Sequence, residues 1–360
     1  MKKVLIIAAA LLIGAGASFV PGEPGDQMHV LAIGVDADDG GGYVFSFLAP
    51  GESHNGDSDA ANTLISVSAE SFGRAEAAAG SYLNRKVNVD HAYLILFSRE
   101  AALRGLAPIT AALSNRGVRP LVCAAVTDGR ALDSLRAADR AGAQSLPGFL
   151  SAFTEKNSRV FPRLSSFYHL YPQFESGARA AVLPYFSGGD TPKWGMAIIK
   201  DLTGAAFLGE EDAFLFAAAA GLLPDEYTCA DEVAGGKGFG VYLKPRRSPE
   251  IDVDVTGSAP EISVRLSFDC RIICPPDGGD ERLIAAELER LLERRIGGFL
   301  YRTAREYNAD VLGIYERIAP KFPTLGALDA YGFYEKYRGS VFRVTVKLSP
   351  GDTDFCGAKA

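Results

Sequence analysis

The chain has 360 residues, of which 48% are hydrophobic and 22% charged, so it is ordinary for a folded globular protein and long enough for two or three domains. The net charge of −7 excludes the broad basic face that nucleic-acid binding requires, so no nucleic acid is expected as a partner. The five cysteines are scattered and odd in number, which excludes a disulfide framework.

The first segment, MKKVLIIAAALLIGAGASFVPG, has the order of an export signal: charged start, apolar middle and small-residue exit. No later apolar run approaches the roughly 20 residues of a spanning helix, so the body is expected beyond the membrane. The small residues 15–17 allow cleavage between Ala17 and Ser18. The uncharged residues 4–20 would instead allow an uncleaved signal anchor. Both outcomes stay open, and we favour cleavage.

Strand and helix patterns then alternate, which predicts a mixed sheet covered by helices. HVLAIGVD and GYVFSFLAP, residues 29–36 and 42–50, predict a β-hairpin. The aspartates at its tip, Asp36, Asp38 and Asp39, lack the spacing of a calcium loop and are predicted to be solvated. The next expected elements are a helix over 68–83, a strand over 90–98, a helix over 98–115 interrupted near Pro108, a strand over 118–129 and a helix over 130–139.

The aromatic stretch FYHLYPQF follows a loosely patterned region rich in proline. Aromatic side chains of this kind form core, a partner interface or a ligand groove, and the sequence leaves all three open. The candidate partner interface consists of Phe167, Tyr168, Tyr171 and Phe174. Residues 193–225 then predict strand, turn, strand and an apolar helix, and CADEVAGGKGFG predicts a glycine-rich linker.

The last third has the clearest patterns. EISVRLSFDCRI alternates as a half-buried antiparallel strand, with its inward face formed by Ile262, Val264, Leu266, Phe268 and Cys270. Residues 279–310 predict a long amphipathic helix with a weak point at Gly297-Gly298, because glycine disfavours helix interiors. A second helix over 311–323 and a final strand over 341–352 complete a three-stranded sheet with helices on one face.

These patterns predict an α+β chain of mixed sheets flanked by helices. The predicted division is a signal or anchor segment over 1–25, an N-terminal domain over 26–145, a middle domain over 146–235 and a C-terminal domain over 236–355.

The sequence contains no local catalytic signature. The four histidines are widely separated, GxSxG is absent, and GGKGFG lacks the Ser or Thr of a phosphate loop. His91 is expected to be structural or exposed, and Cys270 and Cys274 to be small buried residues rather than metal ligands. No catalytic residue, cofactor or metal is therefore predicted, although a hydrolase triad assembled in space stays open.

Four stretches carry a resemblance to one family: HVLAIGVDADDGGGYVFSFLAP, the segment from AESFGRAEAAAG to LRGLAPI, GMAIIKDLTGAAFLGEED, and the closing segment from ERLLERRIGGFL to VFRVTVKL. Their order and spacing resemble the C subunits of spore germinant receptors, the Ger(x)C lipoproteins, over nearly the whole mature chain. The stretches include the family's Gly-x-Ala-hydrophobic-x-Lys-Asp element and its Ala-Asp-hydrophobic-hydrophobic-Gly turn, and the order and spacing of the stretches carry the resemblance rather than any one motif. The chain departs from the family at Ala15, where the lipid-bearing Cys would stand, and at Tyr334 or Tyr337, where a Trp is usual.

The resemblance implies a non-enzymatic subunit of three mixed α/β domains on the outer face of the spore inner membrane. It also implies partnership with a membrane A subunit and a transporter-like B subunit, in a receptor that responds to nutrient germinants. The alternatives are an exported solute-binding protein that holds a small molecule between domains and, third, an exported hydrolase. Since lipidation requires a Cys, the resemblance leaves membrane association to a signal anchor or to the partner subunits.

Overall fold

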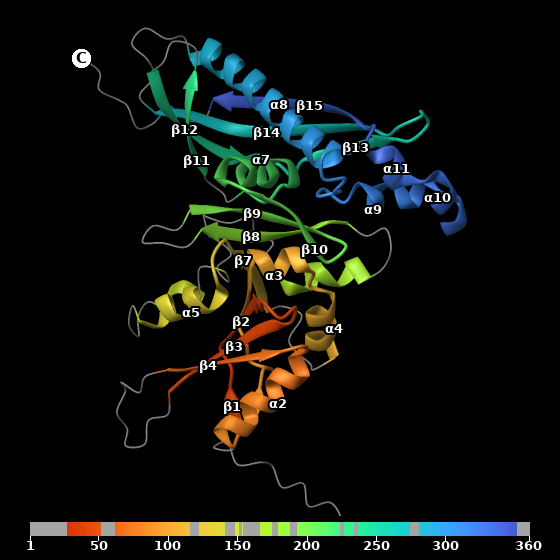
Figure 1. The fold of residues 1–360 in the computed structure, drawn as a ribbon. Coiled ribbons are helices and arrows are strands. Elements are labelled where there is room, and N and C mark those ends of the chain that lie inside the picture. Colours follow the sequence, from red (N-terminus) through yellow and green to blue (C-terminus); the bar gives the residue numbers. More distant parts are fainter. Residues whose placement is uncertain are drawn as a thin grey trace, which may run out of the picture.

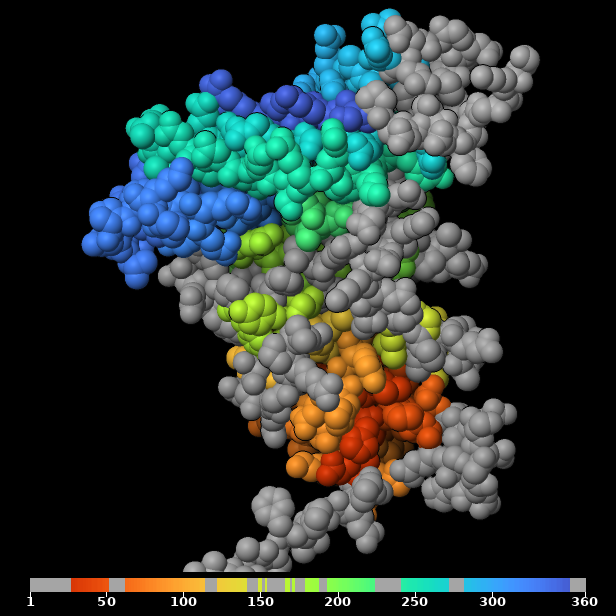
Figure 2. Space-filling model, turned by 180° about the vertical axis from the view of Figure 1, so that it is seen from behind, coloured from red at the N-terminus to blue at the C-terminus, as the bar shows by residue number. Residues whose placement is uncertain are grey.

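The computed structural model describes residues 27–51, 62–115, 122–140, 148–150, 153, 166–174, 179–187, 193–223, 227–233, 237–273 and 281–350. Within these ranges the elements are stacked along one long axis, with the N-terminal elements at one end and the C-terminal sheet at the other (Figure 1). The view from behind shows the same succession of bands along the molecule (Figure 2). The mixed α/β class predicted from the sequence is confirmed.

Eight strands of the described chain form one mixed sheet in the order β10-β9-β8-β7-β6-β2-β3-β4. The central strands β2, β6, β7 and β8 run parallel, and the hairpins at both ends are antiparallel. The bounds are β2 Ala32–Ala37, β3 Tyr43–Ala49, β4 Thr63–Ala69, β6 Leu94–Ser98, β7 Cys123–Thr127, β8 Ala181–Ser187, β9 Lys193–Lys200 and β10 Thr203–Leu208. The predicted β2–β3 hairpin is confirmed, with six residue pairs in register from Ala32↔Leu48 to Ala37↔Tyr43.

Helices cover both faces of this sheet. One face packs against α2 (Phe72–Leu83), α3 (Arg99–Arg104) and α4 (Ala107–Asn115), and the other against α5 (Ala131–Arg140). The predicted helix over 98–115 is interrupted at Gly105, whose φ of 120° ends α3, and Pro108 lies within α4. The short strands β1 (Gln27–His29) and β5 (Lys86–Asn88) pair separately.

The C-terminal sheet has five strands among the described residues, not the predicted three. They are β11 Tyr227–Val233, β12 Lys237–Pro245, β13 Glu250–Asp254, β14 Glu261–Ile273 and β15 Val341–Pro350. The predicted linker CADEVAGGKGFG instead contributes to the β11–β12 hairpin, since β11 pairs with β12 over seven residues. Glycine-rich segments often form linkers, but glycine also occurs within a strand when the neighbouring strand supplies the hydrogen bonds.

Strand β14 confirms the predicted alternation, because its inward side chains, from Ile262 to Cys270, are buried. It pairs antiparallel with β12 and β13 on one side and parallel with β15 on the other. The predicted domain boundary at 235/236 falls between β11 and β12, so the strands on its two sides belong to one sheet. The three-domain division itself stays a prediction.

Helix α8 (Glu281–Arg305) is continuous through Gly297-Gly298, so the predicted weak point does not interrupt it. Its apolar stripe, from Leu288 to Leu300, is buried in the C-terminal core. The same helix also lies along strand β15 and supplies side-chain acceptors to it. Tertiary packing on both contacts outweighs the helix propensity that the two glycines lack.

Helix α8 covers the outer edge of β15 with acceptors one helical turn apart. The carboxylates of Glu289 and Glu293 accept the amides of Leu348 and Val346 at 2.7 and 3.0 Å. The Tyr301 hydroxyl accepts the Phe342 amide at 3.1 Å. Edge strands otherwise present unpaired amides to other chains, so this ladder protects the C-terminal sheet.

Candidate functional site

The β8–β9 hairpin joins the two halves of the molecule. Its alternating side chains face two different cores: Ala197 and Ile199 pack with the first sheet's helices, whereas Met196 and Ile198 pack with α7 (Glu210–Ala220) and the C-terminal elements. Figure 1 shows α7 between the eight-stranded sheet and the C-terminal sheet. Because one hairpin supplies both cores, the two halves are packed together rather than hinged on a linker.

Asp36 lies near the carboxyl end of strand β2, in the parallel part of the first sheet. Its two carboxylate oxygens accept the amides of Ala131 and Leu132, in the first turn of α5, at 2.6 and 3.0 Å. Helix N-termini at the carboxyl ends of parallel strands are where such sheets hold anionic ligands, and here a side chain of the protein occupies that position. Burial raises the pKa of Asp36, and these two amides offset part of that effect.

The prediction that Asp36 is solvated at the hairpin tip is wrong. Asp36 lies inside β2 and is only 1% exposed, while Asp39 is exposed. Strand β2 continues to Ala37, so the hairpin tip begins only at Asp38. The carboxylate of Asp36 is directed to a helix 95 residues away in the chain. A contact of that range has no local sequence signature.

A second polar cluster lies on the exposed end of β7 and β8. The Tyr185 hydroxyl donates to Asp128 at 2.5 Å, and Arg99 donates to the same carboxylate oxygen at 3.2 Å. The bond from Tyr185 lowers the pKa of Asp128, with Arg99 acting in the same direction, and burial together with Asp128 raises the pKa of Tyr185 to about 12. The three groups satisfy one another, which indicates a structural ion-pair cluster.

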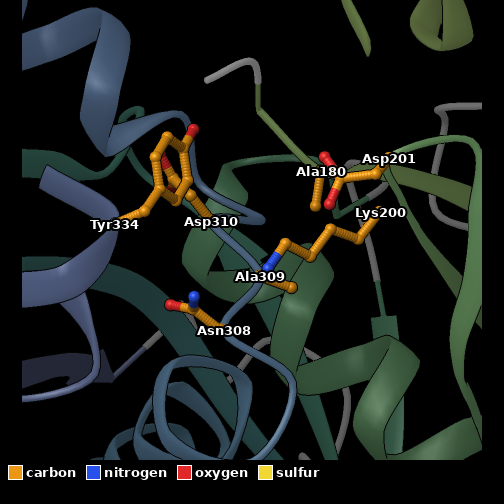
Figure 3. A pocket seen from close by; sticks show the side chains of 7 residues that line it. All are labelled: Ala180, Lys200, Asp201, Asn308, Ala309, Asp310 and Tyr334. Carbon is orange, nitrogen blue, oxygen red and sulfur yellow. The ribbon is translucent and has the colours of Figure 1, made fainter. Parts of the chain in front are cut away.

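A polar cavity of about 170 Å³ lies between the first sheet and the C-terminal half, and we call it the junction cleft. One wall comes from the start of β8 and from the β9–β10 turn, and the other from the loop after α8 and from helix α11 (Phe333–Tyr337). Figure 3 shows Tyr334 and Asp310 on one side and Lys200 and Asp201 on the other. The lining residues are Ala180, Lys200, Asp201, Asn308, Ala309, Asp310 and Tyr334.

Asp310 is the buried acid of the junction cleft and is 1% exposed. Its Oδ2 accepts the Tyr315 amide at 2.8 Å, at the start of helix α9 (Ile314–Ile318), whereas its Oδ1 meets no hydrogen-bond donor. Burial raises the pKa of Asp310, and the Ile314 and Tyr315 amides and Arg179 lower it by less. Asn308 Oδ1, in the same cleft, is also buried without a donor.

Backbone bonds fix the loop that carries these groups. The Asp310 carbonyl accepts the Ala180 amide at 3.1 Å, and the Arg179 guanidinium donates twice to the Val311 carbonyl, at 3.2 and 3.0 Å. Arg179 is therefore directed to the backbone rather than to the Asp310 carboxylate.

Tyr334 forms the aromatic wall of the cleft. Its ring stacks on Tyr315, with centroids 5.9 Å apart, and packs edge-on against Phe333 at 5.0 Å. Burial raises the pKa of the Tyr334 hydroxyl well above its ordinary value, and the nearby Asp310 carboxylate acts in the same direction. The hydroxyl is therefore neutral over the physiological pH range.

The aromatic residues predicted as a partner interface are divided by the fold. They lie on η2 (Phe167–Phe174), where Phe167 is fully buried in the core of the first sheet and packs edge-on against Tyr171. Tyr171 is half-buried, and Tyr168 is 54% exposed. The side chain of Phe174 lies outside the described residues. Phe167 thus serves the core, and Tyr168 is the described side chain that a partner can reach.

Ala17 and Ser18, the predicted cleavage residues, lie outside the described residues. Within the described ranges, no helix is long and apolar enough to cross a membrane. In the same ranges no three His, Cys, Asp or Glu side chains gather closely enough to hold a metal ion. Cys270 is buried as predicted, His91 is exposed, and Cys274 is outside the described residues.

Two family models match the chain in tandem. Residues 23–188 match the spore germination protein N-terminal domain, and residues 195–349 match the spore germination B3/GerAC-like C-terminal domain. The chain belongs to the Ger(x)C family of spore germinant-receptor C subunits. The family is one of membrane-associated lipoproteins. The gap between the two models falls in the β8–β9 turn, so the Ger(x)C halves meet within one hairpin.

A solved structure supports this fold. The crystal structure of the GerBC protein superposes with a TM-score of 0.52 at 14% identity, covering 88% of this chain and 96% of that chain. The comparison with curated proteins returned no match.

The junction cleft itself was not predicted. Five of its seven lining residues nevertheless lie in two of the stretches that carried the family resemblance, since Lys200-Asp201 ends GMAIIKD and Asn308-Ala309-Asp310 precedes VLG. The available signal was an Asp directly before the apolar segment VLGI, because an acid that is buried there requires donors. What the sequence could not supply was the proximity of two segments more than 100 residues apart.

Proposed function

We propose that this Ger(x)C chain is the non-enzymatic C subunit of a spore germinant receptor and acts with the A and B membrane subunits in nutrient-triggered germination. The observation that carries the proposal is the tandem match of the two family models over residues 23–188 and 195–349. The shared β8–β9 hairpin supports a scaffold role, since a subunit that works through contacts benefits from halves that keep a fixed relation.

The proposed location is the extracytoplasmic face of the spore inner membrane. The N-terminal segment brings the chain there, either as a signal cleaved between Ala17 and Ser18 or as an uncleaved anchor. N-terminal sequencing of native protein, combined with a high-salt wash of spore membranes, separates the two. A chain that starts at Ser18 and is released by salt supports cleavage with retention by partners. An intact start that needs detergent for release supports an anchor.

The receptor role is tested by affinity purification from detergent-solubilised spore membranes. The tagged chain is expected to bring down a transporter-like membrane protein and a second membrane subunit, and spores that lack it are expected to lose a nutrient response. Purification of the chain alone, together with normal germination of the deletion strain, would contradict the proposal.

Tyr168 is the proposed point of partner contact. Exposed aromatic side chains are enriched at interfaces and contribute strongly to binding. Tyr168→Ala is expected to lower the yield of co-purified membrane subunits without changing the fold. Tyr82→Ala is the matched control, because Tyr82 is 81% exposed on α2 at the far end of the molecule. Equal yields for the two variants would remove Tyr168 from the interface.

The junction cleft favours a second candidate function, a solute-binding protein. The specific observation is a polar cavity of about 170 Å³ between the two halves of the molecule, lined in part by Lys200, Asp201 and Tyr334. This activity and a receptor role are compatible.

A further inference from the structure

Strand β4 (Thr63–Ala69) forms one edge of the eight-stranded sheet, and among the described residues it pairs only with β3. In an antiparallel edge strand, alternate residues direct their backbone N–H and C=O groups away from the sheet. These groups of β4 meet no hydrogen-bond partner in the described chain. We propose that this edge pairs antiparallel with β4 of a second copy of this chain, which joins two eight-stranded sheets into one.

The other edges of the described sheets are protected in ways that β4 is not. Strand β10 has a bulge between Gly204 and Ala206, and α3 packs against it. Strand β13 is rich in acidic residues, and Lys321 donates to its Val253 carbonyl. Side chains of α8 cover the outer edge of β15, β11 contains two acidic residues, and β1 and β5 have three residues each. Such features prevent unwanted pairing between sheet edges.

Strand β4 lacks each of these features. Its sequence, TLISVSA, contains no charged residue and no proline. Its seven residues pair with β3 in an unbroken register, so no bulge turns the edge away from an incoming strand. Three of the seven residues are β-branched, which favours extended backbone. An uncharged, regular edge of this kind is a preferred site for the addition of another strand.

The sequence of β4 is complementary to itself across a twofold axis. Full overlap of the seven residues places the axis at Ser66, which then lies opposite Ser66 of the second copy. Ile65 lies opposite Val67 of the second copy on the face that packs with α2, and Leu64 lies opposite Ser68 on the other face. Because β4 carries no charge, the pairing places no like charges together. A second copy supplies this match by symmetry, which favours it over an unrelated strand.

The position of β4 leaves the rest of the molecule free in such a dimer. The strand ends the sheet on the side opposite β9 and β10, which lie next to the C-terminal half (Figure 1). The side chains of Ser66 and Ser68 are exposed. Seven residues per copy form an interface smaller than that of a stable complex, so we expect weak and reversible association in dilute solution.

Cysteine crosslinking of the purified full-length protein tests both the pairing and its register. Ser66→Cys places two thiols directly opposite each other, where the two Cα atoms lie about 4.5–5.5 Å apart, a separation that disulfides span. Ser68→Cys is the matched control, because its two copies lie roughly 13 Å apart along the strands. After oxidation by copper phenanthroline in air, non-reducing electrophoresis should show at least tenfold more dimer for Ser66→Cys than for Ser68→Cys or wild type.

A charge on the edge tests the same contact without crosslinking. Ser68→Lys places an ammonium group beside the apolar Leu64 of the other copy, at both ends of the paired strands. Ser258→Lys, at an exposed position in the C-terminal half, is the matched control. Sedimentation velocity at rising protein concentration should show dimer formation by wild type and Ser258→Lys, and at least tenfold weaker dimer formation by Ser68→Lys.

Three results would overturn the proposal. Equal dimer yields for Ser66→Cys and Ser68→Cys would show that the thiols meet by collision rather than in register. Equal self-association of wild type and Ser68→Lys, with the fold verified by circular dichroism, would place the contact on another surface. A wild type that stays monomeric, combined with no crosslinking of Ser66→Cys above the wild-type level, would assign the edge to a strand of another protein.

Discussion

The two halves of the molecule each contain a buried aspartate that accepts backbone amides at the start of a helix, and the two differ in one oxygen. Asp36 and Asp310 are each 1% exposed, and burial raises the pKa of both. Both oxygens of Asp36 accept amides of α5, whereas one oxygen of Asp310 accepts the Tyr315 amide and the other is buried with no donor at hydrogen-bond geometry. Full satisfaction stabilises the buried carboxylate of Asp36, and partial satisfaction leaves a buried acceptor at Asp310 that lowers stability.

Replacing each aspartate by asparagine tests this difference between the two sites, and Asp36→Asn is expected to have the largest effect on stability. Asp36→Asn must direct an NH₂ group at one of two amide donors, because both carboxylate oxygens are occupied. The expected loss in the free energy of unfolding is about 2–3 kcal/mol, from an unpaired buried amide and the loss of a charge-assisted bond. Urea unfolding followed by circular dichroism measures it. Asp39→Asn, at the exposed hairpin tip, is the control, and a loss equal to that control would refute the structural role of Asp36.

The two aspartates also mark what could be predicted from the sequence. The long helix and the alternation of β14 were predictable because their signals are local periodicities. Asp310 lay in a motif that carried the family resemblance, and its capping partner is five residues away. Asp36 was assigned to the wrong environment because its partners are 95 and 96 residues away. The junction cleft was missed for the same reason, since it depends on the proximity of distant segments.

Asp310→Asn should have a smaller effect that depends on pH. An asparagine can keep its oxygen on the Tyr315 amide and place its NH₂ group where Oδ1 of the wild type meets no donor, so the expected loss at pH 7 is below about 1 kcal/mol. The folded-state pKa of Asp310 is raised above 3.8, so the wild type is most stable below that value and loses stability as the pH rises through the folded-state pKa.

The variant lacks this titration. Its free energy of unfolding, relative to wild type, should therefore increase between pH 4 and pH 8, as measured by urea unfolding at each pH. A difference that does not vary with pH would show that Asp310 keeps an ordinary pKa in the folded state.

Partly exposed carboxylates extend the comparison to weaker cases. Glu293 accepts the Val346 amide on the outer edge of β15 and is only half-buried, so water can replace it in part. Glu293→Ala is expected to lower the free energy of unfolding by about 1 kcal/mol. Glu287→Ala, on the exposed side of the same helix, controls for the change in helix propensity. Equal losses in thermal or urea unfolding would mean that the ladder on β15 contributes nothing measurable.

The smallest expected effect is a gain at the gap in that ladder. Residues 289, 293, 297 and 301 follow one another at helical spacing, and Gly297 is the member without an acceptor. By strand alternation the Val344 amide faces this position, and a Cβ on Gly297 would lie 3.9 Å from Val344 Cγ2, an ordinary contact. Gly297→Ala is therefore expected to raise the free energy of unfolding by about 0.5–1 kcal/mol through helix propensity alone.

Gly298→Ala provides the matched control, because its Cβ would meet open space and should yield the same gain. Gly297→Gln adds an acceptor that can reach the Val344 amide, so a further gain over Gly297→Ala would measure the missing bond directly. If Gly297→Ala instead lowers the urea midpoint while Gly298→Ala raises it, the close approach of α8 to β15 needs the glycine. The missing acceptor at position 297 would then be explained by the packing of α8 against β15, whereas no such packing limit applies to Asp36, whose two oxygens both accept amides.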